Sequence, residues 1–415
     1  MTQPIIICGG GIGGLATALA LAKFGLPSIV LEQAPKFGEI GAGIQLAPNA
    51  FSVLDQLGVG QRARDNSVFI DELVMMDSHD GEMLVRLPVG EEFRARFGNP
   101  YAVAHRTDLH LSLLEGCEAS PLITLKNSQR LVSFEEKGDG VVVTTASGET
   151  LSGSALIGAD GINSVVRQAI VNDGPPIVSG HLTYRAVLPP SEIPEDLRWN
   201  AATLWAGPKT HIGHYPLRGW QLFNIVATFE SGRTTQGANE PADRDEVLAQ
   251  FSNVVPKIRQ LMEVPREWRR WVLMDRDPVT NWTQGRVTLL GDAAHPMLQY
   301  YAQGACMALE DSLCIADKVH AAQGDLAAAF QAYQKARLVR TARVQMGSRL
   351  IGRYLFHPDG AERDVRNAVL RSQSPREFYD GFQWLYGGPD QAPSPGSMLA
   401  PLSNVTSMQS HRGAA

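Results

Sequence analysis

The chain has 415 residues and a formal net charge of −6 at pH 7, and no run of lysine and arginine stands out. This length exceeds one typical domain, so we expect two lobes built around more than one core. The acidic balance argues against nucleic acid or an anionic membrane as the main partner, which leaves a small molecule as the expected ligand.

The N-terminal sequence does not predict a targeting signal. The apolar stretch 5–22 has no lysine or arginine before it and contains five clustered glycines, so it does not predict a signal peptide. No membrane span is expected elsewhere. The four cysteines have neither CxxC nor metal-site spacing, which indicates reduced thiols and a cytoplasmic protein.

The first predicted elements are a strand over 4–8, a tight turn, and a helix over 15–24 that is rich in alanine and leucine. Between them, Gly9, Gly11 and Gly14 form the pattern G-x-G-x-x-G. This pattern supplies a tight turn, close approach of the backbone to a pyrophosphate, and close packing of helix on strand. The phosphates would lie at the helix N-terminus.

A second predicted strand, 28–31, ends at Glu32, about 20 residues past the first glycines, where a carboxylate can bind a ribose. The strand, turn, helix, second strand and acid together predict a Rossmann-type site for an ADP moiety. They do not distinguish NAD from FAD, because both contain ADP.

Two further strand ends carry a carboxylate. Asp160 follows a predicted strand over 155–157, and Asp292 follows one over 286–290. Each corner presents a carboxylate and backbone N–H groups toward a crevice. For Asp160 a second interpretation stays open, since Asp-Gly also forms turns for local reasons.

Together and in this order, these three motifs resemble those of the class A, single-component flavin-dependent aromatic hydroxylases, over residues 4 to 350. The resemblance implies that the N-terminal motif holds the ADP end of non-covalent FAD. It implies that Asp160 lies near FAD and the nicotinamide nucleotide, and that Asp292 binds the ribityl region. The remaining cofactor residues that it implies are Gln45 in the segment 41–45, Arg106 at a helix start, Gly304 and Ala305.

The resemblance also implies an organisation of the chain. We expect an α/β fold in which a Rossmann-type FAD-binding domain (1–175 and 270–350) carries an inserted substrate domain (176–269). Within the insert, apolar and aromatic runs punctuated by proline and glycine predict an antiparallel sheet. A C-terminal helical segment (351–386) and a flexible, Pro-, Ser- and Gly-rich tail (387–415) follow.

The implied chemistry uses NADH or NADPH, FAD and O₂ to place one oxygen atom on an aromatic ring, without a metal. The flavin carries the oxygen chemistry, and the protein must stabilise a phenolate, exclude water and orient one ring carbon.

Candidate residues for activating a phenol lie on the predicted sheet and after the third motif. His211 and Tyr215 share one face of a strand by period-two alternation, Gly213 between them leaves room for a ring, and His214 points the other way. Gln299 stands where the salicylate hydroxylase branch commonly has proline, and its amide can bind a phenolic oxygen.

This set resembles the 3-hydroxybenzoate 6-hydroxylases, which form 2,5-dihydroxybenzoate (gentisate). By that likeness His211 shares the phenol proton, Gln299 holds the phenolate and Tyr215 orients the substrate. Each could instead have a local structural role.

Several alternatives remain open at this point. They are a catechol-forming salicylate 1-hydroxylase, a 6-hydroxynicotinate 3-monooxygenase, a nicotinamide-only dehydrogenase, and a flavin-bound sensor of aromatics without turnover. The sequence does not separate NADH from NADPH. A homodimer is the expectation from the resemblance alone.

Overall fold

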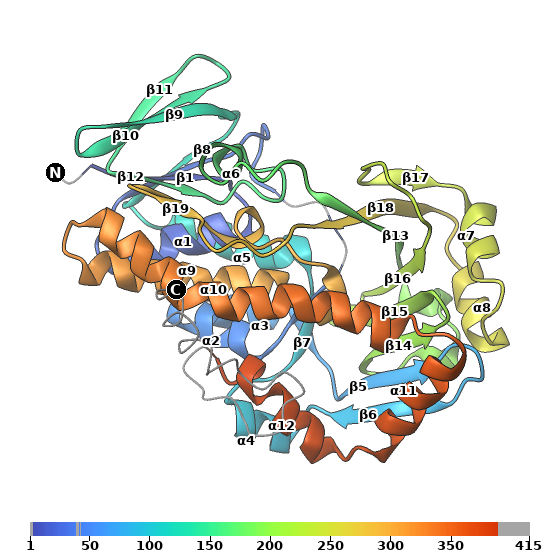
Figure 1. The fold of residues 1–415 in the computed structure, drawn as a ribbon. Coiled ribbons are helices and arrows are strands. Elements are labelled where there is room, and N and C mark those ends of the chain that lie inside the picture. Colours follow the sequence, from blue (N-terminus) through green and yellow to red (C-terminus); the bar gives the residue numbers. More distant parts are fainter. Residues whose placement is uncertain (1–2, 39–40, 42, 389–415) are drawn as a thin grey trace, which may run out of the picture.

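The computed structural model describes residues 3–38, 41 and 43–388. Two lobes lie side by side, one around a mostly parallel sheet and the other around a mostly antiparallel one (Figure 1). Within the described ranges, no helix combines the length and apolar character needed to cross a membrane. All but two residues of the predicted tail fall outside the described residues.

The first lobe is built on a six-stranded sheet in the order β19-β20-β12-β1-β2-β8, parallel except between β19 and β20. The strands are β1 (Ile5–Cys8), β2 (Ser28–Leu31), β8 (Ile123–Lys126), β12 (Ala155–Gly158), β19 (Thr283–Gln284) and β20 (Val287–Leu289). The central strand β1 is apolar and buried along its whole length, as expected for a parallel strand covered on both faces. The predicted strand-turn-helix-strand order of the N-terminus is therefore confirmed.

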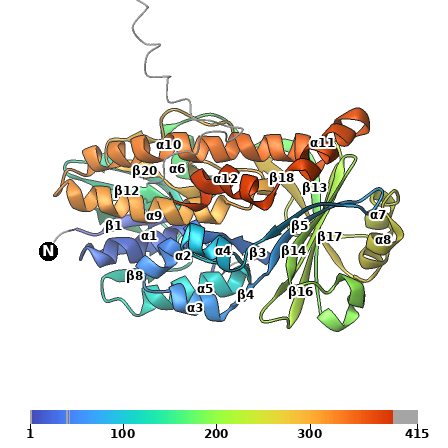
Figure 2. The ribbon, with the colours of Figure 1, turned by 90° about the horizontal axis from the view of Figure 1, so that it is seen from below.

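Helices cover this sheet. The long α9 packs on α1, and α10 packs on α9, so that these helices form successive layers (Figure 2). The helices of this lobe are α1 (Ile12–Lys23), α2 (Pro48–Gln56), α3 (Gly60–Asp65), α4 (Glu91–Phe97), α5 (Arg106–Glu118), α6 (Val165–Ile170), α9 (Gly304–Ala321) and α10 (Leu326–Leu350).

Two small antiparallel sheets flank this lobe. One has the order β11-β10-β9 and the other β3-β7-β4. Their strands are β3 (Gly43–Leu46), β4 (Ser67–Phe69), β7 (Ala102–His105), β9 (Leu131–Lys137), β10 (Gly140–Thr145) and β11 (Thr150–Gly153).

The second lobe contains an eight-stranded sheet in the order β17-β18-β13-β16-β15-β14-β5-β6, antiparallel except for β14 and β5. The strands are β5 (Glu72–Asp77), β6 (Met83–Pro88), β13 (Ile177–Leu188), β14 (Ala201–Gly207), β15 (Thr210–Leu217), β16 (Leu222–Glu230), β17 (Glu240–Ala242) and β18 (Trp268–Asp275). The predicted antiparallel sheet is confirmed. The edge strand β6 and its neighbour β5 come from the N-terminal part of the chain, before the predicted insert begins.

One face of this sheet packs on α7 (Arg244–Gln250) and α8 (Pro256–Glu263), with Trp205 and Phe223 in the core between them. This core covers the outer face. The inner face is thereby left to form a wall of the cavity described below.

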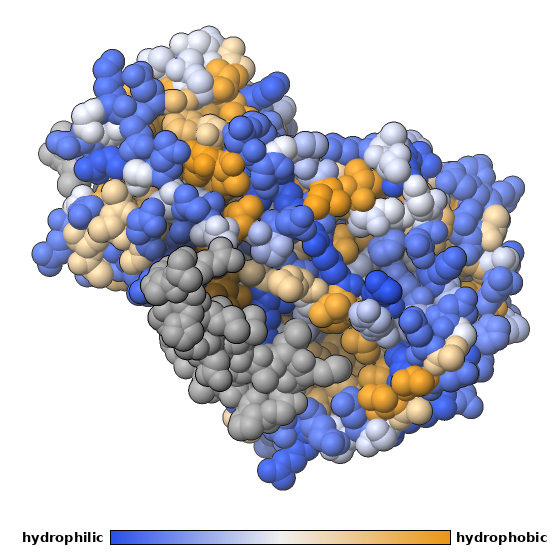
Figure 3. Space-filling view, viewed as in Figure 1, coloured by the Kyte–Doolittle hydropathy of each residue, from blue (hydrophilic) through white to orange (hydrophobic). Residues whose placement is uncertain are grey.

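The C-terminal segment is helical, as predicted. Helix α10 continues into a π-helical turn, η5 (Ile351–Phe356), and α11 (Gly360–Ser372) and α12 (Pro375–Tyr386) then pass beside β6. Short 3₁₀ turns complete the described elements: η1 (Pro190–Glu192), η2 (Glu195–Leu197), η3 (Gly291–Ala293) and η4 (Gln299–Tyr301). Figure 3 shows the surface of one face as mostly hydrophilic with separate apolar patches.

Candidate active site

A cavity of about 600 Å³ lies where the two lobes meet. Its walls come from the β1–α1 turn, β3, η3, η4 and the start of α9 on one side, and from the inner face of the eight-stranded sheet on the other. Elements η5, α11 and α12 line the remaining side. A volume of this size suits a cofactor together with a small ligand.

The β1–α1 turn has the shape that a pyrophosphate requires. A Cβ atom added to Gly9 would lie 2.1 Å from the carbonyl oxygen of Ala159, and one added to Gly14 would lie 1.9 Å from that of Gly9. Gly11 lines the cavity and is the N-cap of α1, which has neither a side-chain cap nor an acid in its first turn. Free backbone N–H groups at a helix N-terminus bind phosphate. The close approaches at Gly9 and Gly14 match the tight turn and the helix packing expected of them, and the approach of this turn to a pyrophosphate stays a prediction.

The two acids near this turn have different surroundings. The carboxylate of Glu32 accepts bonds from the backbone N–H groups of Gly10 (2.9 Å) and Ala34 (2.8 Å), which fixes it at the end of β2. The carboxylate of Asp160 accepts bonds from the Ser164 hydroxyl (2.5 Å) and the Val165 N–H (2.8 Å). Asp160 thus bonds to the start of α6, whose N-cap is Ser164, and a contact of Asp160 with a ligand stays a prediction. Burial raises the pKa of this carboxyl.

The third motif faces the cavity directly. Asp292 is exposed and lines the cavity. Gly304, the first residue of α9, and Ala305 line the same wall, and a Cβ atom added to Gly304 would lie 4.0 Å from Oδ1 of Asp292. Arg106 begins α5 and lines the cavity, and Gln45 on β3 lines it as well and accepts a bond from the Tyr101 hydroxyl (2.5 Å). Ala42, in the same segment 41–45, lies outside the described residues.

A further polar group in this wall lacks a partner. The side chain of Gln303 lines the cavity and accepts a bond from Asn49 (3.0 Å) through Oε1, but its buried Nε2 donates to no described residue. An unsatisfied buried N–H is costly, and a ligand carbonyl or ring nitrogen would satisfy it. The cavity therefore fits FAD by its glycine cradle, its carboxylate at Asp292 and this amide.

A buried ion network holds the third motif in place. Asp311 accepts bonds from the Gly291 N–H (3.1 Å), His295 Nε2 (2.6 Å) and Arg337 Nε (2.6 Å). Burial alone would raise the pKa of Asp311, but His295 and Arg337 lower it to about 2. His295 is thus structural, and α9 and α10 anchor the turn that carries Asp292.

The inner face of the sheet presents residues in cross-strand rows. His211, Gly213 and Tyr215 on β15 all line the cavity, as the alternation predicts. His214 points into the opposite core, where its Nε2 accepts a bond from Trp205 Nε1 (3.1 Å). Burial raises the pKa of Tyr215 to about 12, so its hydroxyl stays protonated at neutral pH.

His211 belongs to a cluster of aromatic and imidazole rings that its own segment does not reveal. Its Nδ1 lies 2.7 Å from Nε2 of His357, and its ring meets those of Tyr300 and Phe356 edge-on or tilted. The Tyr300 hydroxyl is 2.5 Å from His181 Nδ1. Burial, with the neighbouring His357 and His181, lowers the pKa of His211 well below its usual value. His211 is therefore neutral at pH 7.

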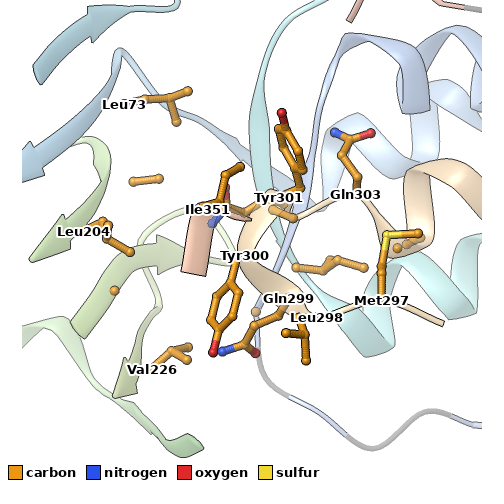
Figure 4. A pocket seen from close by; sticks show the side chains of 18 of the residues that line it. Leu73, Leu204, Val226, Met297, Leu298, Gln299, Tyr300, Tyr301, Gln303 and Ile351 are labelled. Carbon is orange, nitrogen blue, oxygen red and sulfur yellow. The ribbon is translucent and has the colours of Figure 1, made fainter. Parts of the chain in front are cut away.

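The side chain of Gln299 bonds to residues of two neighbouring strands of the sheet, β13 and β16. Its Oε1 accepts a bond from Arg185 (2.8 Å), and its Nε2 donates to the hydroxyls of Thr183 and Thr228 (3.2 Å each). In Figure 4 the side chains of Gln299 and Tyr300 extend together toward the strand that carries Val226, while Tyr301 and Gln303 point away. A ligand oxygen would accept a bond from Nε2 of this amide only by replacing one of the threonines.

Comparison with known proteins places the chain in a family. Residues 2–348 match a family described as an FAD binding domain. The chain is also 49% identical over 384 residues to the 3-hydroxybenzoate 6-hydroxylase of Polaromonas naphthalenivorans (strain CJ2), covering 92% of this chain and 96% of that one. The chain belongs to the FAD-dependent aromatic hydroxylases. FAD is the cofactor of this hydroxylase.

Two more similarities extend this finding. The 3-hydroxybenzoate 6-hydroxylase of Klebsiella oxytoca is 47% identical over 92% of this chain and 96% of its own length. In fold, the hydroxylase is similar to Klebsiella pneumoniae HpxO complexed with FAD and uric acid, with a TM-score of 0.79, 23% identity, and coverage of 91% of this chain and 95% of that chain.

Sequence reasoning missed three side chains of this site: Arg185, His357 and Gln303. Arg185 could have been found from the sequence, because it is the one charged residue in an otherwise mostly apolar and aromatic run, on the same strand face as Thr183. His357 had none, since it reaches His211 across 146 residues through the packing of η5 on the sheet.

Proposed function

We propose that this hydroxylase converts 3-hydroxybenzoate to 2,5-dihydroxybenzoate (gentisate), using NADH or NADPH and O₂. The observation that carries the proposal is the open position at Gly213, flanked by His211 and Tyr215 on the wall of the cavity that fits FAD. A Cβ added to Gly213 would meet nothing closer than 3.8 Å, so an aromatic ring has room there. The names of the relatives reported above point to the same substrate.

His211 is the base for the phenolic proton in this proposal. Its Nε2 makes no hydrogen bond within the described part of the chain, so this nitrogen is free to accept a hydrogen bond from the phenolic hydroxyl. A phenolate directs an electrophilic oxygen to the ortho and para ring carbons, and position 6 of 3-hydroxybenzoate is para to its hydroxyl. The bound flavin supplies the oxygen transfer.

Other residues that line the cavity orient the substrate and exclude water in this proposal. Tyr215, protonated and buried, donates a hydrogen bond that orients the ring, and Gln299 holds the phenolate oxygen after exchanging a threonine partner. Apolar side chains around Gly213, among them Val226 and Leu204, exclude water from the reacting ring.

Product identification tests the proposal. The purified holoenzyme is incubated with NADH or NADPH, oxygen and a panel of hydroxybenzoates and 6-hydroxynicotinate, and products are identified by chromatography and mass. Gentisate from 3-hydroxybenzoate, in stoichiometry with nicotinamide oxidation, is expected. Catechol from salicylate or a dihydroxypyridine would contradict the proposed substrate, and binding of aromatics without turnover would indicate a sensor.

The role of Gln299 has its own test. Replacing Gln299 with Pro removes the amide and should weaken binding of the phenolate form, seen as a changed absorption spectrum and pH dependence of the bound substrate. An unchanged spectrum and pH dependence would show that Gln299 only joins η4 to the sheet.

A further inference from the structure

Arg185 is a half-buried cation whose Nε is fully buried, and it has no carboxylate partner in the described structure. It lies on β13 and lines the cavity beside Gln299, to which its Nη2 donates. The guanidinium carbon is 5.2 Å from the centre of the Trp271 ring, and the buried Nε donates to no described residue. No aspartate or glutamate of the described ranges lies within ion-pair distance.

Other buried arginines of this chain are paired. Arg167 contacts Asp173 at 2.6 Å, and Arg337 contacts both Asp311 and Glu310. Burying a charge is costly unless a counter-ion and hydrogen bonds compensate for the lost water. The missing counter-ion of Arg185 is therefore expected from a ligand, and the cavity that Arg185 lines is where that ligand would bind.

Strand register places Arg185 opposite the open position of the wall. Arg185 pairs with Val226 on β16, and Val226 pairs with Gly213 on β15, so the three lie in one cross-strand row and all line the cavity. Neighbouring strands are about 4.8 Å apart, so about 10 Å of sheet separates the Cα atoms of Arg185 and Gly213. An extended arginine side chain can bridge much of that distance.

We propose that Arg185 binds the carboxylate of the aromatic acid substrate, an inference that rests on the proposed function. The free Nε–H and the adjacent Nη–H form a planar edge that matches two carboxylate oxygens. A ring over Gly213 then has its acid group toward Arg185, and its hydroxyl toward His211 in the neighbouring row of β15. Arg185 thereby selects acids over neutral phenols.

Two ligands could supply anionic oxygens to this guanidinium, the carboxylate of the substrate or the pyrophosphate of the nicotinamide nucleotide. Acid and amide pairs separate the two. Dissociation constants for 3-hydroxybenzoate, 3-hydroxybenzamide, benzoate and benzamide are measured on the FAD-loaded enzyme from the absorption change of the bound flavin, and KM for NADH is measured alongside.

Arg185→Met keeps the apolar stem and removes the charge, and Arg185→Lys keeps the charge without the planar edge. We expect Arg185→Met to weaken binding of both acids about 30-fold or more, with little change for the amides and for NADH. Arg185→Lys should recover part of the preference for acids. Arg86→Met is the matched control, because Arg86 lies on β6 of the same sheet in an exposed pair with Glu72.

Equal losses for acid and amide would overturn the proposal and give Arg185 a structural role through Gln299. A loss confined to KM for NADH would overturn it in favour of the pyrophosphate. If Arg185→Met does not fold, the acid-to-amide ratio of Arg185→Lys decides, and a wild-type ratio there overturns the proposal. The benzoate and benzamide pair does not depend on turnover, so this result stays distinct from a failure of the proposed substrate.

Discussion

Nδ1 of His211 and Nε2 of His357 lie 2.7 Å apart, so one of the two rings donates an N–H hydrogen bond to the other. If Nε2 of His211 is to accept the phenolic proton, its Nδ1 must carry hydrogen and donate to His357. His357 then acts as the acceptor that fixes the tautomer of His211 and stabilises the imidazolium that forms. An acceptor behind a catalytic imidazole has this effect in other enzymes.

Replacing His357 with Phe should slow hydroxylation about tenfold or more, because His211 loses its tautomer and its support as a base. Flavin reduction by NADH should keep its rate, and the pH profile of hydroxylation should shift. His357→Gln places an amide oxygen near the position of Nε2 and should restore much of the rate. Rapid-mixing measurements of both half-reactions check this, with His211→Ala as the reference for complete loss of the base. A wild-type hydroxylation rate in His357→Phe would contradict the positioning role.

Acid sensitivity should follow from the buried His214. Burial, with a smaller effect of Lys257, lowers the pKa of His214 to about 3, while the unfolded chain has the ordinary value of 6.5. Between these values the unfolded state binds the proton and the folded state does not, so the free energy of unfolding falls as the pH drops below 6.5 and is constant above it. The contribution of His214 to the loss from pH 6.5 to 5 is about 2 kcal/mol.

His214→Gln should remove that loss, since an amide oxygen can accept the bond from Trp205 and does not titrate. Urea unfolding at pH 7 and pH 5 measures the difference. His320→Gln, the same substitution at an exposed position of α9, is the control. Equal pH dependence in wild type and His214→Gln would contradict the assignment.

The buried ion network should be a large contributor to stability. Replacing Arg337 with Met leaves Asp311 and Glu310 buried with fewer partners, which we expect to cost about 3–5 kcal/mol of unfolding free energy. Arg259→Met, which removes an exposed pair with Glu263, should cost well under about 1 kcal/mol. Thermal unfolding of the holoenzyme compares them, and similar melting temperatures for the two variants would contradict this ranking.

Local signals explain why much of the cofactor site could be predicted from sequence. The roles of Gly9 and Gly14 depend on contacts with their own turn and the adjacent strand end, and a short motif encodes such contacts. The face shared by His211 and Tyr215 follows from strand alternation alone. The same locality leaves two interpretations at Asp160, where one Asp-Gly corner fits both a ligand contact and the local bonds to the start of α6.

Side-chain partners between distant segments could not be predicted in this way. The amide of Gln299 bonds to Arg185 and to two threonines of the sheet, and nothing near Gln299 in the chain indicates which strands lie beside it. The recruitment of β5 and β6 into the sheet has the same cause. Pairing of β14 with β5 joins segments more than a hundred residues apart.

Asp292 should be needed to retain the cofactor. Its carboxylate is exposed to the cavity and has no hydrogen-bond partner among the described residues, so a ribityl hydroxyl is the expected donor to it. A hydrogen bond to a charged group contributes about 1.5–3 kcal/mol, so Asp292→Ala should weaken FAD binding about 10- to 100-fold. Flavin content after gel filtration and titration of the apoprotein with FAD measure this effect. Asp277→Ala, at an exposed acid that pairs with Arg349, is the control for the loss of a negative charge. Full flavin content and wild-type affinity in Asp292→Ala would mean that the glycine turn and the helix N-terminus hold FAD without this carboxylate.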